Sequence, residues 1–370
     1  MENIIGLITY GRGDFGPLAQ NRPAYMLPFG CRYRLIDFAL STIANNDIDN
    51  VALYAGSMLR STIDHIGNGK SWDLNRRFGG LSIFPEVYSS KYNRSDELVN
   101  IYDSLGFYED NKEEQIFFMD PMTITKIDVR EVYDQHRKDD ADITLIYKTV
   151  QDKEGNYLNY DKMTLNDDET VKNIGVNLGT QDEFNLYLGM GFIKKSVFMD
   201  LIKNALENDN SHSLKGALMK EKDKYKMRTF GYSGRVAVIK DVNSYLAANM
   251  DLLDRDNFYE MFSVNGTILT KSKDEPSTVY YNHARVENSL LANGCLIDGT
   301  VVNSIIFRGV QVGKNAIIKN SIIMEGTTVE DDAVIINCIL DKGTIVKEGV
   351  SLVGSPTNPY TIGKKQIIKR

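Results

Sequence analysis

Up to about residue 255, short apolar runs alternate with longer segments in which apolar positions recur at helical spacing. The runs predict strands at 3–10, 50–56, 115–120, 141–150 and 186–193. The periodic segments predict helices at 33–46, 57–66, 129–138, 196–206 and 242–254, the last with Asp241 or Asn243 as its N-cap. This alternation is typical of an α/β domain in which helices cover a mostly parallel sheet.

The pattern changes after a connector expected at 256–280. Short Ile/Val pairs, separated by Gly, Asn and Asp, replace the helical period, and Asn288, Asn303, Asn320 and Asn337 recur at an interval of about 15 to 17 residues. An aliphatic residue recurs roughly every six positions, which is the hexapeptide pattern of a parallel β-helix. We therefore expect an α/β domain at 1–255 and a β-helix domain at 281–370, because a β-sandwich would not require so regular a period.

Composition narrows the class of protein. A net charge of -7 and a pI near 5.3 argue against a nucleic-acid or anionic-membrane surface. The three cysteines lie far apart, which favours a reducing cytoplasm over a disulfide framework or a zinc site. With no basic leader and no apolar run approaching ~18 residues, we expect neither export nor a membrane span.

The first strand leads into Gly11-Arg12-Gly13, where the backbone could approach a phosphate closely. Such a loop is as often a tight turn, although its place after a strand favours a site. The segment Gly67–Ser71 is not a P-loop, because Asp64 stands where the first glycine is required.

Two basic pairs are candidate anion contacts. Arg32 and Arg34 flank Tyr33 at the start of a long helix, and their guanidinium groups could bind an anion. The alternative is a pair of surface charges offset by Asp37. Arg76 and Arg77 could form a second anion contact, but we favour the interpretation that they are ordinary charges on a solvent-exposed face.

The four histidines show no metal spacing and are expected at the surface or at helix ends; they are His65, His136, His212 and His283. A hexapeptide acyltransferase would need a histidine base inside the coils. Only His283 lies near the coils, and it precedes them. That activity is therefore disfavoured.

The stretch LPFGCRYRLIDFALSTIANN resembles the glucose-1-phosphate adenylyltransferase (ADP-glucose pyrophosphorylase) family, whose members carry PFGGKYRIIDFALSN-like sequence. The likeness continues through SMLRSTIDHIGNGKSWD, LGMGFI, NSYLAANMDLL and the coils, and so covers nearly the whole chain. It implies a Rossmann-like nucleotidyltransferase domain followed by a left-handed β-helix, in agreement with the two periods.

The same resemblance shows which functional positions have changed. The family's phosphate-binding loop, GGxGxRLxPLT, corresponds to the shorter YGRGDFGPLA, with Asp14 or Gly13 near the arginine position. The lysine of RAKPAVPFG falls on Ala24, and the lysine of the sugar-phosphate element FEEKP falls on Gly179. Gly11, Arg12 and Gly13 are then only a remnant of the nucleotide loop.

The carboxylates that hold Mg²⁺ in active members fall on Met122 and Val238. We therefore expect no catalytic residue, metal site or cofactor in this chain, with Mg²⁺ bound by a catalytic partner. An alternative is an active nucleotidyltransferase that uses Arg12 for phosphates and Asp120 and Asp241 for the metal.

A chain that keeps the fold but loses these charged positions resembles the GlgD-type regulatory subunits of bacterial glycogen synthesis. The resemblance implies a chain inactive by itself, assembled with a catalytic ADP-glucose pyrophosphorylase subunit, in a heterotetramer. It also implies an anionic effector, for which Arg32 and Arg34 are the candidates. A stand-alone sensor of a sugar phosphate or nucleotide is the other alternative.

Overall fold

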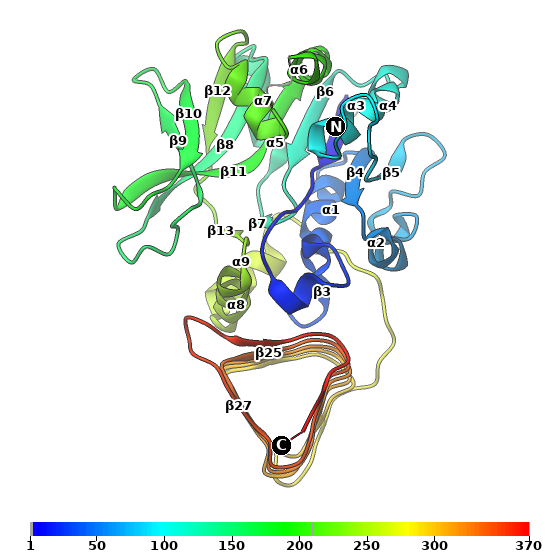
Figure 1. The fold of residues 1–370 in the computed structure, drawn as a ribbon, viewed down its shortest axis with the longest axis vertical. Coiled ribbons are helices and arrows are strands. Elements are labelled where there is room, and N and C mark those ends of the chain that lie inside the picture. Colours follow the sequence, from blue (N-terminus) through cyan, green and yellow to red (C-terminus); the bar gives the residue numbers. More distant parts are fainter. Residues whose placement is uncertain (1–2, 209–210, 370) are drawn as a thin grey trace.

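The computed structural model describes residues 3–208 and 211–369. Its N-terminal part is a sheet with helices on both faces, and its C-terminal part is a β-helix that appears as a triangle when viewed along its axis (Figure 1). The predicted α/β domain and β-helix are both confirmed.

The main sheet runs β10-β9-β11-β6-β1-β4-β5, with β8 paired to β11 and β12 paired to β8. Its strands are β1 (Ile4–Ile8), β4 (Asn50–Gly56), β5 (Gly80–Pro85), β6 (Gln115–Met119), β8 (Ile143–Gln151), β9 (Asp161–Leu165), β10 (Val171–Val176), β11 (Glu183–Lys194) and β12 (Met227–Gly231). β1 is parallel to β4 and β6, but β11 is antiparallel to β6, β8 and β9. The sheet is therefore more mixed than predicted. The segment that connects β8 to β11 in the chain is the antiparallel hairpin of β9 and β10. A parallel pairing of β8 with β11 would instead need a crossover helix in this segment.

Helices cover both faces of this sheet. They are α1 (Leu35–Asn45), α2 (Leu59–Ile66), α3 (Glu97–Asp103), α4 (Leu105–Asp110), α5 (Val129–Lys138), α6 (Lys195–Glu207), α7 (Leu214–Lys220), α8 (Val242–Met250) and α9 (Arg255–Ser263), with short 3-10 turns at Gly16–Ala19, Ala24–Met26, Lys70–Trp72 and Asp251–Leu253. Ile4 and Ile8 of β1 face one core cluster, whereas Ile5 and Leu7 face the other. Burial on both faces explains why the first strand is continuously apolar.

The β-helix is built from three parallel sheets. The first contains β14 (Val279–Tyr280), β17 (Leu296–Ile297), β20 (Gln311–Val312), β23 (Thr328–Val329), β26 (Ile345–Val346) and β29 (Ile367–Ile368). The second contains β15 (Arg285–Glu287), β18 (Thr300–Val302), β21 (Ile317–Lys319), β24 (Val334–Ile336) and β27 (Ser351–Val353). The third contains β16 (Leu290–Leu291), β19 (Ile305–Ile306), β22 (Ile322–Ile323), β25 (Cys338–Leu340) and β28 (Tyr360–Ile362).

The third sheet faces the N-terminal domain (Figure 1). In β22, Ile323 points into the β-helix core, and Ile322 belongs to the large core cluster that includes α1. Both side chains are fully buried. The paired isoleucines of the repeat thus join the two domains into one hydrophobic core.

Two short ribbons complete the N-terminal domain and position the site. β2 (Pro28–Phe29) pairs with β3 (Tyr33–Arg34), and β7 (Thr123–Thr125) pairs with β13 (Val236–Val238). The segment expected as a connector contains α9, and the first β-helix strand follows at Val279. Within the described part of the chain, no helix combines the length and apolar character needed to cross a membrane.

Candidate functional site

A cleft lies beyond the carboxyl ends of β1, β4 and β6, and it consists of two adjoining cavities. The loop cavity, about 340 Å³, is lined by the Gly11–Gly13 loop, Ala24 and the end of β4. The strand-end cavity, about 320 Å³, is lined by the segment after β6 and by residues 238–240. Tyr10, Arg12 and Glu97 line both cavities.

The glycines of the loop are required for packing within this chain. A Cβ on Gly11 would lie 2.9 Å from the sulfur of Met122, and one on Gly13 would lie 2.5 Å from the carbonyl oxygen of Lys240. The Asp14 amide donates to that same oxygen at 2.9 Å. Internal contacts therefore account for both glycines without a phosphate, while the exposed Arg12 side chain reaches the cavities.

Met122 and Val238, which the sequence resemblance aligns with metal-binding carboxylates, lie on neighbouring strand segments. β7 and β13 pair antiparallel with Val238 opposite Thr123, and the Ile239 amide donates to the Met122 carbonyl at 2.9 Å. Both residues line the strand-end cavity. The fold thus brings the two aligned positions to one cavity.

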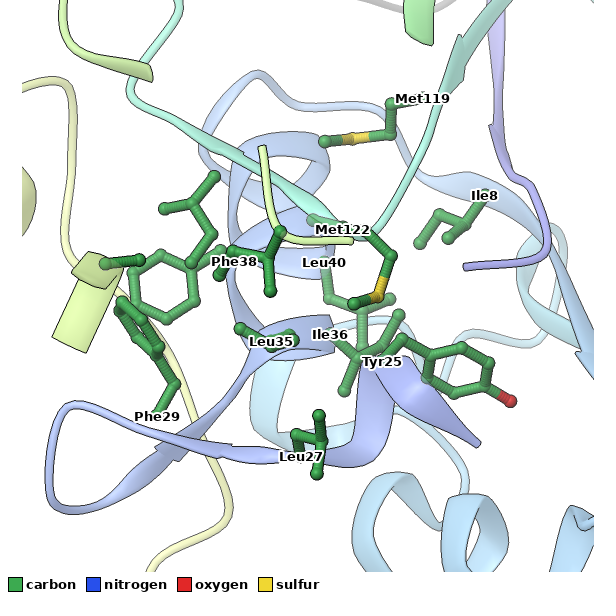
Figure 2. Close-up of a cluster of buried hydrophobic side chains, with 14 of the residues drawn as sticks. Ile8, Tyr25, Leu27, Phe29, Leu35, Ile36, Phe38, Leu40, Met119 and Met122 are labelled. Carbon is green, nitrogen blue, oxygen red and sulfur yellow. The ribbon is translucent and has the colours of Figure 1, made fainter. Parts of the chain in front are cut away.

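Neither side chain at this pair can bind magnesium. Met122 is 2% exposed and belongs to the buried cluster of Ile8, Tyr25 and Leu40 (Figure 2). Mg²⁺ requires oxygen ligands, usually carboxylates and water, and a thioether and an isopropyl group offer none. The residues present therefore do not fit the metal at this position.

Two other carboxylates, Asp120 and Asp241, are the alternative metal ligands. Asp120 Oδ1 accepts the Met122 amide at 2.8 Å, and burial raises the pKa of Asp120 to about 6. Asp241 caps α8 by accepting the Ser244 amide at 2.8 Å, and it does not line the strand-end cavity. The described residues contain no group of three or more His, Cys, Asp or Glu side chains that could hold a metal ion.

The two lost lysines have different surroundings. Ala24, in the turn Ala24–Met26, lines the loop cavity and is 8% exposed. Gly179 lies in an exposed loop after β10, has a φ of +71°, and does not line either cavity. The structure therefore brings Ala24, Met122 and Val238 to the cleft and leaves Gly179 outside it.

The cleft contains two lysines that sequence reasoning missed. Lys215, in the first turn of α7, pairs with Asp161 at 2.7 Å. Lys240 lies 3.8 Å from the ring centroid of Tyr160 and donates to the Leu158 carbonyl at 2.5 Å. Ser213 is a recognisable N-cap before Lys215, and that signal could have placed this lysine at a helix start.

Glu97 is a second buried acid of the cleft, beside Asp120. Desolvation raises its pKa to about 7, although Arg12 opposes the shift. Asp96, its neighbour, caps α3 through the Val99 amide. The cleft thus combines cations with buried carboxyls, but without a pair of carboxylates at the metal positions.

Arg32 and Arg34 lie at a second site, between the two domains. We call it the cation cavity; it has a volume of about 40 Å³. Its lining brings together six cationic side chains: Arg32, Arg34, Lys271, Lys273, Arg308 and Lys342. The single carboxylate of the lining is Glu325.

The pKa values of two side chains in the lining reflect this excess of positive charge. Burial would raise the pKa of Glu325, but Lys342 and Lys273 outweigh it and lower the value to about 2. Burial and then Arg34 lower the pKa of Lys342 to about 8. Arg308 also pairs with Glu275, outside the lining, at 3.5 Å. The lining still holds more cations than carboxylates, so a bound anion would reduce their repulsion.

The Asp37 carboxylate hydrogen-bonds groups other than the two guanidiniums, and its charge opposes the burial that lowers the pKa of Arg34. Asp37 accepts the Arg34 backbone amide, and its carboxylate also bonds His65 at 2.6 Å and Thr270 at 2.6 Å. The Arg34 guanidinium instead donates to the Met26 carbonyl at 2.8 Å. Arg34 is therefore half-buried rather than a surface charge, whereas Arg32 is exposed and lies over the Tyr33 ring.

The four histidines lie at helix ends or at the surface, as expected. His65 and His136 end helices, as expected, but both are largely buried, and His136 bonds Thr144 at 2.8 Å. His212 and His283 are exposed. Arg76 pairs with Asp49 and Asp73, in keeping with the solvated interpretation.

Fold and cleft together define a nucleotidyl transferase domain joined to a hexapeptide β-helix. The Nucleotidyl transferase family model matches residues 11–219, and the model for the GlmU-like C-terminal hexapeptide matches residues 277–358. The chain belongs to the glucose-1-phosphate adenylyltransferase family of nucleotidyl transferases.

Its relatives include two named "Glycogen biosynthesis protein GlgD". The Bacillus subtilis (strain 168) protein is 30% identical over 320 residues, and the Geobacillus stearothermophilus protein is 32% identical over 320 residues; each match covers 86% of this chain and 82% of the relative. A glucose-1-phosphate adenylyltransferase of Clostridium botulinum (strain Alaska E43 / Type E3) is 29% identical over 326 residues, covering 86% of this chain and 83% of the relative.

Proposed function

We propose that this chain is a non-catalytic, regulatory subunit of ADP-glucose pyrophosphorylase that modulates a catalytic partner in the cytoplasm during bacterial glycogen synthesis. The observation that carries the proposal is the apolar pair Met122 and Val238, side by side where the reaction needs metal-binding carboxylates. The GlgD relatives support the assignment to glycogen synthesis.

The reaction joins ATP and glucose 1-phosphate, so several phosphates must be held close together. A metal and fixed cations normally neutralise their charge, and one lost electrostatic contact costs about 3–4 kcal/mol of transition-state stabilisation. Here the metal positions are apolar and the loop lysine is Ala24. Lys215 and Lys240 could hold a phosphate, but lysines supply no metal site.

We expect assembly as a heterotetramer, with Mg²⁺ bound by the catalytic chain. The cation cavity is the site at which an anionic effector would act. Its lining comes from both domains, so an anion bound there would favour one arrangement of the domains and could pass that preference to the partner.

The primary test is pyrophosphate release from ATP and glucose 1-phosphate with Mg²⁺. It compares this chain alone, the catalytic chain alone and the two co-expressed. We expect no turnover from this chain alone and an altered rate or substrate dependence in the complex. Turnover by this chain alone, abolished by Asp120→Asn, would overturn the proposal in favour of an active enzyme with displaced ligands.

The effector site has its own test in the complex. Arg32→Ala is expected to abolish the response of the rate to inorganic phosphate while leaving assembly intact on size-exclusion chromatography. Arg60→Ala is the matched control, because its side chain is 95% exposed and lies outside the cation cavity. An unchanged response in Arg32→Ala would remove this site from the proposal.

A stand-alone sensor is the second candidate, favoured by Arg12, Lys215 and Lys240 in the strand-end cavity. Calorimetry with glucose 1-phosphate and ADP-glucose distinguishes the two functions. Binding without any effect on the catalytic chain would favour the sensor.

A further inference from the structure

Lys240 lines the strand-end cavity, and its backbone is held from two sides. Its carbonyl oxygen accepts the Asp14 amide at 2.9 Å, and its own amide donates to Ser244 Oγ, in the first turn of α8, at 3.0 Å. The backbone of Lys240 is therefore fixed to the wall of the cleft. Its long side chain is the part of this residue that can change partners.

The side chain of Lys240 reaches the loop between β8 and β9, residues 152–160, which we call the flap. Lys240 Nζ donates to the Leu158 carbonyl at 2.5 Å and lies 3.8 Å from the centroid of the Tyr160 ring. An ammonium over the face of a tyrosine ring is attracted by the charge distribution of that ring. One side chain thus ties the flap to the wall of the cleft.

The first part of the flap is organised by its own hydrogen bonds. The Asp152 carboxylate accepts the amides of Asn156 and Tyr157, at 2.6 and 3.0 Å. The Leu158 side chain is 46% exposed, so apolar burial contributes little to holding this part in place. Residues 152–158 can therefore move as a unit when the bond to Leu158 is lost.

The last part of the flap has attachments of its own. The Asn159 amide donates to the Asn177 carbonyl at 2.8 Å, and the Tyr160 hydroxyl donates to the Val238 carbonyl at 3.1 Å. These bonds lie next to the start of β9 and do not involve Lys240. They define the end about which the first part of the flap would turn.

Lys240 differs in its partners from Lys215, the other lysine of the cavity. Lys215 pairs with the Asp161 carboxylate at 2.7 Å, whereas Lys240 contacts a neutral carbonyl and a neutral ring. Burial lowers the pKa of Lys240, although Asp241 and Asp161 oppose the shift. A charged acceptor binds an ammonium more strongly than a neutral carbonyl does. An oxyanion in the cavity would therefore compete with Leu158 for Lys240.

Cations and carboxyls both line this cavity: Arg12, Lys215 and Lys240, with Glu97, Asp120 and Asp161. Burial raises the pKa of Glu97 to about 7 and that of Asp120 to about 6. Near pH 6 both carboxyls are protonated in part, so they oppose an anion less than fully ionised carboxylates would.

We propose that Lys240 is a latch that an anion releases. Its ammonium holds the flap to the wall of the cleft through Leu158, and a phosphate group that enters the strand-end cavity draws the ammonium away and frees the flap. Arg12 and Lys215 share that phosphate, because they line the same cavity. The inference goes beyond the proposed function, since it holds whether or not this chain modulates a partner.

Hydrogen–deuterium exchange of the full chain at pH 6 tests the latch, read on peptides that cover residues 153–160. The probes are inorganic phosphate and glucose 1-phosphate, with sodium chloride at equal ionic strength as the reference. We expect either probe to raise the exchange rate of these peptides about tenfold, because the flap loses a hydrogen bond from a charged donor. The more potent probe identifies free phosphate or a phosphate ester as the source of the anion.

Two variants locate the effect. Lys240→Met removes the ammonium, so its flap should exchange about tenfold faster without a probe and gain nothing further from phosphate. Lys153→Met is the matched control, because Lys153 is exposed, belongs to the flap and does not line the cavity. It should keep both the slow exchange and the response to phosphate. Equal exchange of β-helix peptides in all chains shows that the variants are folded.

Unchanged or slower exchange of the flap in phosphate would overturn the inference. So would slow exchange in Lys240→Met, or a phosphate response that survives this substitution. Arg32→Ala is measured as well, because the cation cavity could also take up phosphate. A response that is lost in Arg32→Ala would place the effect at that cavity and contradict the latch.

Discussion

At the scale of single residues, Met122 and Val238 show that the backbone of the cleft can keep its geometry when the side chains are apolar. Their backbones are held by the β7–β13 pairing and by the Ile239–Met122 hydrogen bond. Their side chains are apolar, and Met122 is part of the buried core. Strand pairing depends little on side-chain chemistry, so the geometry of the site persists without its ligands.

Restoring the carboxylates should restore metal binding. We expect Met122→Asp combined with Val238→Asp to bind Mn²⁺, because both positions line the strand-end cavity and two carboxylates there would supply oxygen ligands. Manganese binding by electron paramagnetic resonance measures the effect. Val236→Asp, on the same strand but outside the cavity, is the control, and equal Mn²⁺ binding by the unmodified chain would contradict the argument.

Asp120 provides a pH test. Its folded pKa, about 6, lies above its ordinary value of 3.8, so the folded state holds the extra proton between them. The free energy of unfolding therefore falls as pH rises from about 4 to 6. Asp120→Asn should match the original stability near pH 4 and exceed it by up to about 3 kcal/mol at pH 8.

Urea unfolding at both pH values measures this difference. Asp128→Asn is a control, because this carboxylate caps a helix in the ordinary way. An Asp120→Asn variant that is less stable at pH 8 would show that the ionised carboxylate has a favourable partner, as a metal ligand would.

At the scale of elements, the asparagine ladder explains the repeat seen in the sequence. Asn288, Asn303, Asn320 and Asn337 all adopt positive φ, between 41° and 52°. Asn320 Nδ2 donates to Asn337 Oδ1 at 3.2 Å, and Asn303 Nδ2 donates to Asn320 Oδ1 at 3.4 Å. Asparagine tolerates this backbone and also bonds the next coil, so both requirements select it.

Substitutions at Asn320 separate these two requirements. Asn320→Gly keeps the left-handed backbone and loses the amide bonds, whereas Asn320→Ala loses both. We expect Asn320→Ala to cost about 2 kcal/mol and Asn320→Gly about 1 kcal/mol. Thermal unfolding measures the order, with the exposed Lys319→Ala as control; equal costs would show that the backbone conformation is unstrained.

At the scale of the whole molecule, a buried ion pair crosses the domain boundary. Arg22 lines the loop cavity and pairs with Asp341 of the β-helix at 2.5 Å, with side chains 6% and 3% exposed. The Lys342 amide donates to Asp341, and the Lys342 side chain lines the cation cavity. The cleft and the interdomain cavity are therefore joined through adjacent residues.

Breaking this pair should destabilise the chain strongly. Arg22→Ala or Asp341→Ala leaves one buried charge unpaired, which costs about 3–5 kcal/mol. The double variant Arg22→Met with Asp341→Leu should be much less destabilised, because it leaves no charge. Chemical unfolding of the three variants measures this, and a double variant that loses the sum of both single costs would contradict the argument.

Much of the fold could be read from the sequence because local patterns determine it. The strands at 50–56 and 115–120, the helix at 129–138 and the asparagine period follow from side-chain spacing alone. The strand at 186–193 was predicted, but its antiparallel pairing was not, because the hairpin β9–β10 that precedes it has no strong apolar period. Their positions at the start of a predicted helix also marked Arg32 and Arg34 as candidate anion contacts.

What the sequence alone determined was the order of the elements, the coil repeat and the identity of residues at family positions. Only the tertiary structure decided which residues meet. Lys271, Lys273, Arg308 and Lys342 join Arg32 and Arg34 from distant parts of the chain. Met122 and Val238 likewise become neighbours through a strand pairing. Spacing encodes local geometry, but charge and coordination depend on distances in space that only the packed chain defines.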